Sequence, residues 1–72
     1  MAKVLASMAG TVSEILVTKG DKIEVGQDVV ILESMKMLIP IQSRENGIVK
    51  EVIAKVGEFI NQDEVLLELE EE

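Results

Sequence analysis

The 72-residue sequence contains no cysteine and no histidine. Without cysteine the chain can form neither a disulfide nor a thiolate nucleophile, and it lacks the usual ligands of zinc and iron–sulfur centres. Without histidine it also lacks the most common general base. The sequence therefore predicts a chain that is not an enzyme by itself, has no catalytic residue and binds no metal.

Aromatic residues and positive charge are also scarce. Phe59 is the only aromatic residue, and seven basic against 14 acidic residues give a formal net charge of −7. A chain without stacking platforms and with a negative potential is a poor binder of nucleic acid or anionic membranes. We therefore expect neither partner. The acidic run ELEEE, residues 68–72, is expected to be a solvated end.

Long apolar runs are absent as well. No segment approaches the roughly 18 apolar residues that would span a bilayer, and no charged and then apolar leader follows Met1. We therefore expect a cytoplasmic protein. A chain of this length is expected to form one domain, residues 1–72, because it is too short to build two cores.

What the sequence does contain is short groups of Val, Ile and Leu between turn residues. Groups of about four to eight such residues are typical of strands. We expect about eight strands, in AKVLA, GTVSEILV, KIEV, DVVILE, MLIPI, GIVKEVIA, FI and EVLLELE. A helix is the alternative for VSEILV and VKEVIA, but both start beside a glycine and end at a glycine turn. Turns are expected at residues 19–21, 25–27, 45–47 and 56–58, and Asn46–Gly47 is the strongest short hairpin signal.

The sequence also repeats at an offset of 37 residues. Gly10 aligns with Gly47 and Gly20 with Gly57, and the alignment needs no gap. Chance similarity between two valine-rich halves does not explain aligned turn glycines, so we interpret the pattern as a true repeat. The expected copies are residues 1–33 and 38–70, joined by residues 34–37.

Two similar four-strand halves are expected to pack as pseudo-twofold-related sheets around one core. The predicted fold class is therefore all-β, a flattened barrel or sandwich of two four-stranded antiparallel sheets. The joining residues should lie at one end. The chain ends, including Glu71–Glu72, should lie at the other.

The join falls within ILESMKMLIPI, residues 31–41, where Lys36 stands between two methionines. Because apolar residues resume at Met37, a two-residue hairpin centred on Met35–Lys36 is expected, with positive φ at both positions. That conformation costs an unbranched residue about 1 kcal/mol. A local rule broken without an evident packing gain indicates a functional site. The alternative is that the methionines fill gaps in the core and Lys36 is a solvated turn lysine.

The ESMKM motif, preceded by VGQDVVIL and followed by LIPI, resembles the biotinyl/lipoyl attachment domain family over nearly the whole chain. The sequence is similar to small free-standing bacterial biotin/lipoyl attachment proteins and to the biotin carboxyl carrier domains of carboxylases. Two features depart from the family. Ser34 stands where alanine is usual, and the Pro/Ala-rich linker of multidomain carboxylase subunits is missing.

The resemblance implies that biotin protein ligase attaches biotin covalently to Lys36 and recognises the neighbouring residues Glu33, Ser34, Met35 and Met37. It also implies a swinging arm that carries carboxyl groups from a biotin carboxylase to a carboxyltransferase. In the lipoyl branch the lysine usually stands beside Asp and Ala or Ser, so the paired methionines favour biotin.

Three other functions remain open at this stage. The chain could carry lipoate, attached by a lipoate ligase, or both cofactors. It could be an unmodified β-barrel adaptor for a basic partner. A hydrolase using Ser34, or Ser7 with a carboxylate, is the least supported, since no histidine is present.

Overall fold

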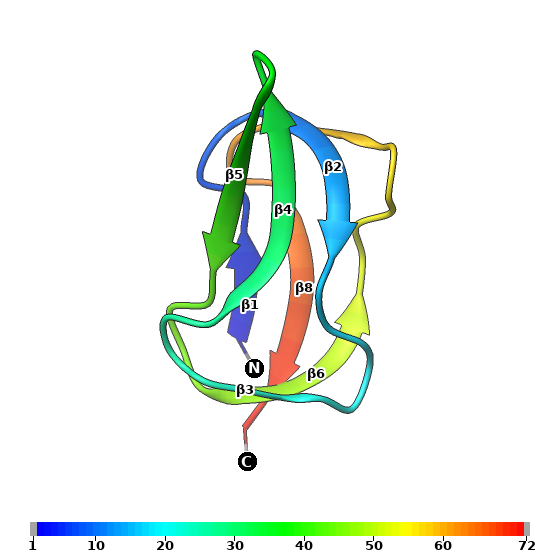
Figure 1. The fold of residues 1–72 in the computed structure, drawn as a ribbon. Helices are drawn as coiled ribbons and strands as arrows, with labels where there is room; N and C mark the ends of the chain where they lie inside the picture. The colour runs from blue at the N-terminus through cyan, green and yellow to red at the C-terminus, as the bar shows by residue number, and fades with distance from the viewer. Residues whose placement is uncertain (1, 72) are drawn as a thin grey trace.

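The structure of the protein is a computed structural model, which describes residues 2–71 (Figure 1). These residues form eight strands, each overlapping one of the expected apolar groups: β1 (Ala2–Leu5), β2 (Gly10–Ile15), β3 (Lys22–Ile23), β4 (Asp28–Ser34), β5 (Met37–Gln42), β6 (Gly47–Val52), β7 (Phe59–Ile60) and β8 (Val65–Glu70). VSEILV and VKEVIA therefore contribute to strands and not to helices. Across residues 2–71 no helix is long and apolar enough to traverse a bilayer.

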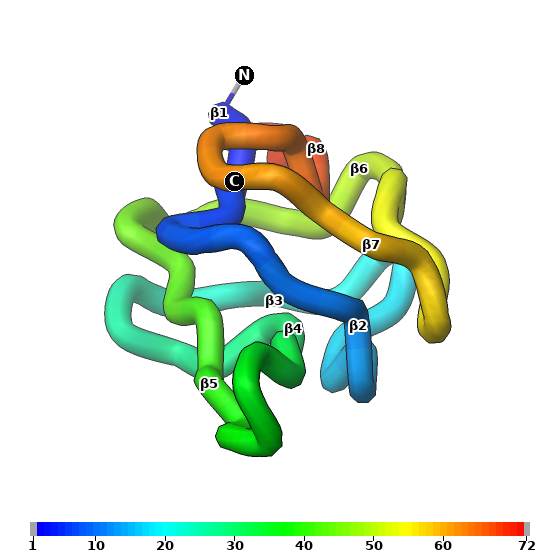
Figure 2. The backbone as a smooth tube through the Cα atoms, turned by 90° about the horizontal axis from the view of Figure 1, so that it is seen from above, coloured from blue at the N-terminus to red at the C-terminus, as the bar shows by residue number. Residues whose placement is uncertain are grey.

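The strands pair into two four-stranded antiparallel sheets, which confirms the predicted fold class. The strand orders are β1-β8-β6-β3 and β5-β4-β2-β7. Each sheet draws two strands from each half of the sequence, so the halves are interleaved and neither forms a sheet by itself. The expectation that the two halves pack as two separate sheets is therefore wrong. Figure 2 shows β2, β4 and β5 on one side of the body and β1, β6 and β8 on the other.

One core lies between the sheets, and its members fall largely in pairs related by the offset of 37. Alternating side chains of a strand point to opposite faces, so the inward positions can be compared directly between the halves. Val12 and Val49 are both buried, as are Leu32 and Leu69. The other buried pairs in which both residues are hydrophobic are Val4 with Ile41, Val17 with Ala54, Ile23 with Ile60, Val29 with Leu66 and Val30 with Leu67.

Backbone hydrogen bonds join the halves symmetrically. The N–H of Val12 donates to the carbonyl of Glu58 at 2.9 Å, and the N–H of Gly57 donates to the carbonyl of Val12 at 2.8 Å. The equivalent pair links Val49 to the turn at residues 20–21, again at 2.9 and 2.8 Å. The second strand of each half is therefore tied to a turn of the other half.

Two glycines permit a close approach between neighbouring strands. A Cβ atom at Gly10 would lie 2.9 Å from the carbonyl oxygen of Glu33, and one at Gly47 would lie 2.8 Å from the carbonyl oxygen of Glu70. Both distances are too short for a carbon against backbone oxygen. The two glycines are therefore required by strand packing, and they are required at equivalent positions.

The expected hairpin at Asn46–Gly47 is wrong. Neither residue has positive φ, and the strands on either side belong to different sheets, since β5 pairs with β4 whereas β6 pairs with β3 and β8. Asn46 instead accepts a hydrogen bond from the N–H of Val25 through its side-chain oxygen, at 2.9 Å. Gly47 is needed for close packing and not for a turn.

The acidic run at residues 68–72 is only partly a solvated end. Residues 68–70 belong to β8, and Leu69 among them is buried. Glu71 is exposed, and Glu72 lies outside the described residues. β1 begins and β8 ends at the end of the body opposite the β4–β5 hairpin, as expected from the position of the join (Figure 1).

Gly47→Ala is expected to lower the free energy of unfolding by about 1–3 kcal/mol, because the added methyl group overpacks against the backbone of β8. Gly10→Ala should have an effect of the same size, since its surroundings are equivalent. Urea denaturation measures both, with Ser13→Ala on the exposed surface of β2 as the control. Wild-type stability in both glycine variants would contradict the close approach.

Candidate functional site

The connection between β4 and β5 is a two-residue hairpin that projects from one end of the body (Figure 1). Ser34 pairs directly with Met37, so only Met35 and Lys36 lie in the turn. Their φ angles are +52° and +66°, both positive, as in the primed turns that fit the twist of antiparallel strands. The expected hairpin and its unusual backbone are therefore confirmed.

The strands below the hairpin tip are firmly held. β4 pairs with β2 on one side and β5 on the other, and Val29, Val30 and Leu32 of β4 are completely buried. A tip conformation that is unfavourable for its own residues persists only when the surroundings determine it. Here the paired and buried part of β4 provides that support.

The side chains at the tip are turned to solvent. Met35 is 89% exposed and Met37 60% exposed, so the interpretation of both as core gap fillers is wrong. Lys36 is exposed, and its side chain makes no hydrogen bond or ion pair within residues 2–71. The hairpin therefore presents a free primary amine between two exposed thioether side chains.

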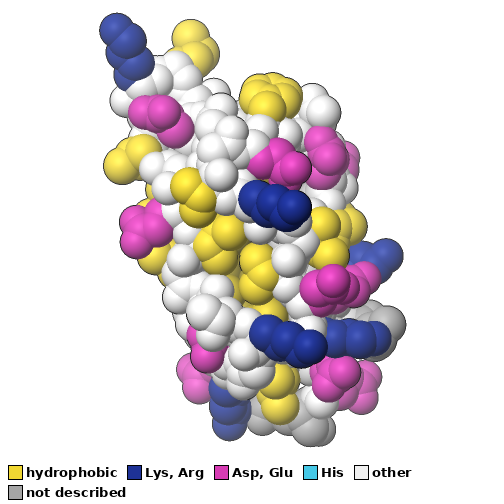
Figure 3. All heavy atoms as spheres, turned by 90° about the vertical axis from the view of Figure 1, so that its right-hand side faces the viewer, with side chains coloured by type: hydrophobic (Ala, Val, Ile, Leu, Met, Phe, Trp, Pro, Cys, Tyr) yellow, Lys and Arg dark blue, Asp and Glu magenta, His cyan; other side chains and the backbone are white. Residues whose placement is uncertain are grey.

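The other residues expected at the site lie at the base of the tip. Glu33 is exposed and Ser34 is half-buried at the end of β4. The carboxylate of Glu33 has no hydrogen-bond or ion-pair partner among the described residues. Figure 3 shows the side of the molecule to the right in Figure 1, with a basic and a hydrophobic side chain projecting at the hairpin end.

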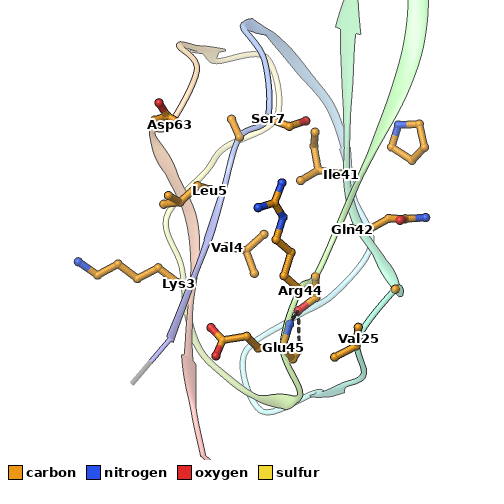
Figure 4. A pocket seen from close by; sticks show the side chains of 14 residues that line it. Lys3, Val4, Leu5, Ser7, Val25, Ile41, Gln42, Arg44, Glu45 and Asp63 are labelled. Atoms are coloured by element: carbon orange, nitrogen blue, oxygen red, sulfur yellow. Dashed lines mark hydrogen bonds between the residues drawn. The ribbon is translucent and has the colours of Figure 1, made fainter.

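A groove of about 710 Å³ lies elsewhere, between the edge strands β1 and β5 (Figure 4). Of its lining residues, sequence reasoning proposed only Ser7 as a candidate site residue. Most of the lining consists of pairs related by the offset of 37, such as Val4 with Ile41 and Ser7 with Arg44. The groove therefore lies at the pseudo-twofold centre of the repeat. No residue of the segment 33–37 lines it.

The serines considered for a hydrolase are not activated. Ser7 lies in the exposed loop after β1, and Ser34 lies at the hairpin base. Neither hydroxyl group has a hydrogen-bond partner among residues 2–71, so no base is positioned to remove its proton. Within the same residues no three acidic, histidine or cysteine side chains gather to hold a metal ion.

The described residues thus form a two-sheet sandwich with an exposed lysine on a tight hairpin. A family model described as biotin-requiring enzyme matches residues 2–69. The chain therefore belongs to the biotin/lipoyl attachment family.

Curated relatives include carriers named for either cofactor. A biotin/lipoyl attachment protein of Bacillus subtilis is 58% identical over 86% of this chain and 85% of its own length. A biotinylated protein TB7.3 homolog of Mycobacterium leprae is 40% identical over 88% of this chain and 89% of its own length. The dihydrolipoyllysine-residue acetyltransferase component of the Pseudomonas aeruginosa pyruvate dehydrogenase complex is 44% identical, but this chain covers only 12% of it.

Solved structures agree with the fold. A domain of a single-chain, multi-domain long-chain acyl-CoA carboxylase superimposes with a TM-score of 0.83 at 27% sequence identity. The match covers 92% of this chain and 7% of the carboxylase. The sandwich observed here thus occurs as one small part of a much larger enzyme.

Lys36→Gly is expected to raise the free energy of unfolding by about 0.5–1 kcal/mol, because glycine adopts positive φ without steric cost. The matched control is Lys19→Gly. Lys19 is an exposed turn lysine without positive φ, so glycine there should lower stability through the greater entropy of the unfolded chain. Urea denaturation gives both values. A shift in the same direction for the two variants would contradict the strain assigned to the tip.

Proposed function

We propose that this chain is a non-catalytic carrier domain, residues 1–72, that holds biotin covalently on Lys36. The main supporting observation is that an exposed, unpaired lysine occupies a strained tip where glycine or asparagine would cost less. Membership of the attachment family provides a reason for keeping a lysine there.

The surroundings of Lys36 suit a group that is attached covalently and not one that is held in a pocket. Lys36 and its two neighbours, Met35 and Met37, are all exposed. No residue of the segment 33–37 lines the groove. A covalent bond is then the means of retaining the group. An enzyme can also approach the amine without moving any other part of the chain.

The reaction at Lys36 is amide formation. A lysine ammonium must lose a proton before it becomes a nucleophile, and no carboxylate contacts it here. We infer that a biotin protein ligase supplies the base and the activated acyl group. The Nζ atom then attacks the acyl carbon, the N–C bond forms, and the activating group leaves with the bonding electron pair.

The attached arm would serve separate active sites. Biotin supplies a ureido nitrogen that accepts a carboxyl group and later releases it. The lysine stem contributes a flexible tether, which keeps the group at high effective concentration near any enzyme that docks the carrier. The partners we propose are a biotin carboxylase and a carboxyltransferase, and we expect the protein to act in the cytoplasm.

Biotin is preferred over lipoate because of the residues on either side of Lys36. Met35 and Met37 resemble the biotin branch of the family, and a relative that matches this chain over 89% of its own length is named as biotinylated. Lipoate, attached by a lipoate ligase, is the second candidate cofactor, because the dihydrolipoyllysine-residue acetyltransferase component from P. aeruginosa is also a relative.

We further propose that the ligase recognises Glu33, Ser34, Met35 and Met37. The two methionines offer exposed apolar surface beside the amine, and thioether side chains adapt well to a binding partner. Glu33 offers an unpaired carboxylate. Serine at position 34 is small, so it should not obstruct modification.

Lys36→Arg is expected to abolish biotinylation, because arginine keeps the charge but is not acylated by a ligase. The measurement is the intact mass of the chain after incubation with biotin protein ligase, biotin and ATP. A parallel reaction with lipoate and lipoate ligase tests the second candidate. Lys55→Arg, at another exposed lysine, is the control and should be labelled like the wild type. Labelling of the Lys36→Arg variant would refute the attachment site.

Met35→Ala and Met37→Ala should each slow biotinylation roughly tenfold or more through lost apolar contact with the ligase. Because both side chains are exposed, the melting temperature should stay within about 2 °C of the wild type. Val56→Ala is the matched control, since Val56 is 65% exposed and lies on a different turn. Unchanged initial rates in both methionine variants would remove them from the recognition site.

A further inference from the structure

The internal repeat allows the outer surfaces of the two sheets to be compared position by position. Residues directly opposite on paired strands share one face of the sheet. We call a set of such residues, on the face turned away from the core, an outward row, and we count the rows from the hairpin tip. On the sheet that carries the hairpin, the first outward row consists of Leu38, Glu33, Thr11 and Phe59. The second outward row is Pro40, Ile31 and Glu14. We call these two rows the hairpin face.

The equivalent surface of the other sheet is strongly charged. Its first row contains Lys22, Ile48 and Glu70, and its second row contains Lys3, Glu68 and Glu51. At an offset of 37, Phe59 corresponds to Lys22, Pro40 to Lys3 and Ile31 to Glu68. The halves therefore share their inward positions but differ in chemistry at these outward ones.

Folding does not explain the apolar residues of the hairpin face. Phe59 is 60% exposed and Leu38 is 63% exposed, so each leaves apolar surface in water that burial would stabilise. The same backbone carries Lys22 where the hairpin face carries Phe59. Because the fold accommodates a lysine there, the apolar side chains point to an interaction outside the chain.

The charge of the hairpin face is also unbalanced. Its two rows contain Glu33 and Glu14 and no basic residue. On the other sheet, by contrast, Lys3 stands directly opposite Glu68. A complementary partner would therefore offer apolar side chains together with a basic group for Glu33. A second copy of this chain does not fit, since two copies of net charge −7 would oppose their own carboxylates.

The hairpin face is continuous with the lysine. Glu33 precedes Lys36 by three residues and Leu38 follows it by two, so the first row lies within about 10 Å of Lys36 along the strands. An enzyme that holds the Lys36 amine in its active site must also come close to this row. The partner expected on the hairpin face is therefore the enzyme that acts on that amine.

We propose that the hairpin face is the docking surface for the ligase that modifies Lys36. The ligase covers Phe59 and Pro40 with apolar side chains and places a basic side chain against Glu33. The inference rests on the proposed function, because it requires Lys36 to be a ligase substrate. It extends recognition from the segment 33–37 to residues that are distant in the sequence.

The test replaces apolar residues by those that the other sheet already carries. Phe59→Lys and Pro40→Lys introduce the equivalents of Lys22 and Lys3 at exposed positions, so both variants should fold. The control is Val25→Lys, because Val25 is 61% exposed and precedes β4 at the end away from the hairpin. Each of the three variants adds one positive charge.

Initial rates of labelling by biotin protein ligase are measured as a function of carrier concentration. We expect Phe59→Lys and Pro40→Lys each to raise KM roughly tenfold with little change in kcat. Val25→Lys should keep the wild-type KM. Complete labelling of all variants after long incubation should show that Lys36 remains accessible, and thermal melting should show that they are folded.

Two results would overturn the inference while leaving the proposed function intact. One is a wild-type KM in both hairpin-face variants. The other is an equal rise in KM for Val25→Lys, which would assign the effect to net charge. A wild-type chain that is not labelled at all would instead refute the proposed function, and the docking surface with it.

Discussion

The structure depends on the backbone hydrogen bonds that tie the second strand of each half to a turn of the other half. Val12 is bonded to residues 57 and 58, and Val49 is bonded to residues 20 and 21. These bonds force the halves to interleave, so neither can bury its own apolar face alone. Gly10 and Gly47 complete the constraint because they allow neighbouring strands to approach. Both sheets therefore pack on one shared core, which allows a chain of only 72 residues to form a rigid structure.

The hairpin uses that rigidity. Its two tip residues lie in a backbone region that costs free energy, and the buried residues of β4 hold them there. The join between the halves is also where the chain can vary without disturbing either copy of the repeat. Met35 and Met37 can therefore remain exposed beside Lys36, although apolar side chains usually stabilise a small protein by entering its core.

Much of this arrangement could be predicted from the sequence, because the determinants are local. Short Val- and Ile-rich groups between turns predicted the eight strands, and the resumption of apolar residues directly after Lys36 predicted a two-residue turn. The Asn46–Gly47 prediction failed because the same dipeptide can serve strand packing, which depends on a distant partner in β8. The positive φ of Asp63 was missed, since only its equivalence to Gly26 in the other half reveals it. The hairpin face needed the register of four strands, which no local pattern contains.

The isolation of the Lys36 side chain has a consequence for how a loaded carrier is distinguished from an empty one. Acylation of Lys36 would change the formal charge of the chain by one unit without breaking any hydrogen bond or ion pair within residues 2–71. The body would therefore keep the same packing and nearly the same stability in both states. The loaded and unloaded forms would then differ only in the modified side chain of Lys36. An enzyme that must select the loaded form therefore has to contact the cofactor itself.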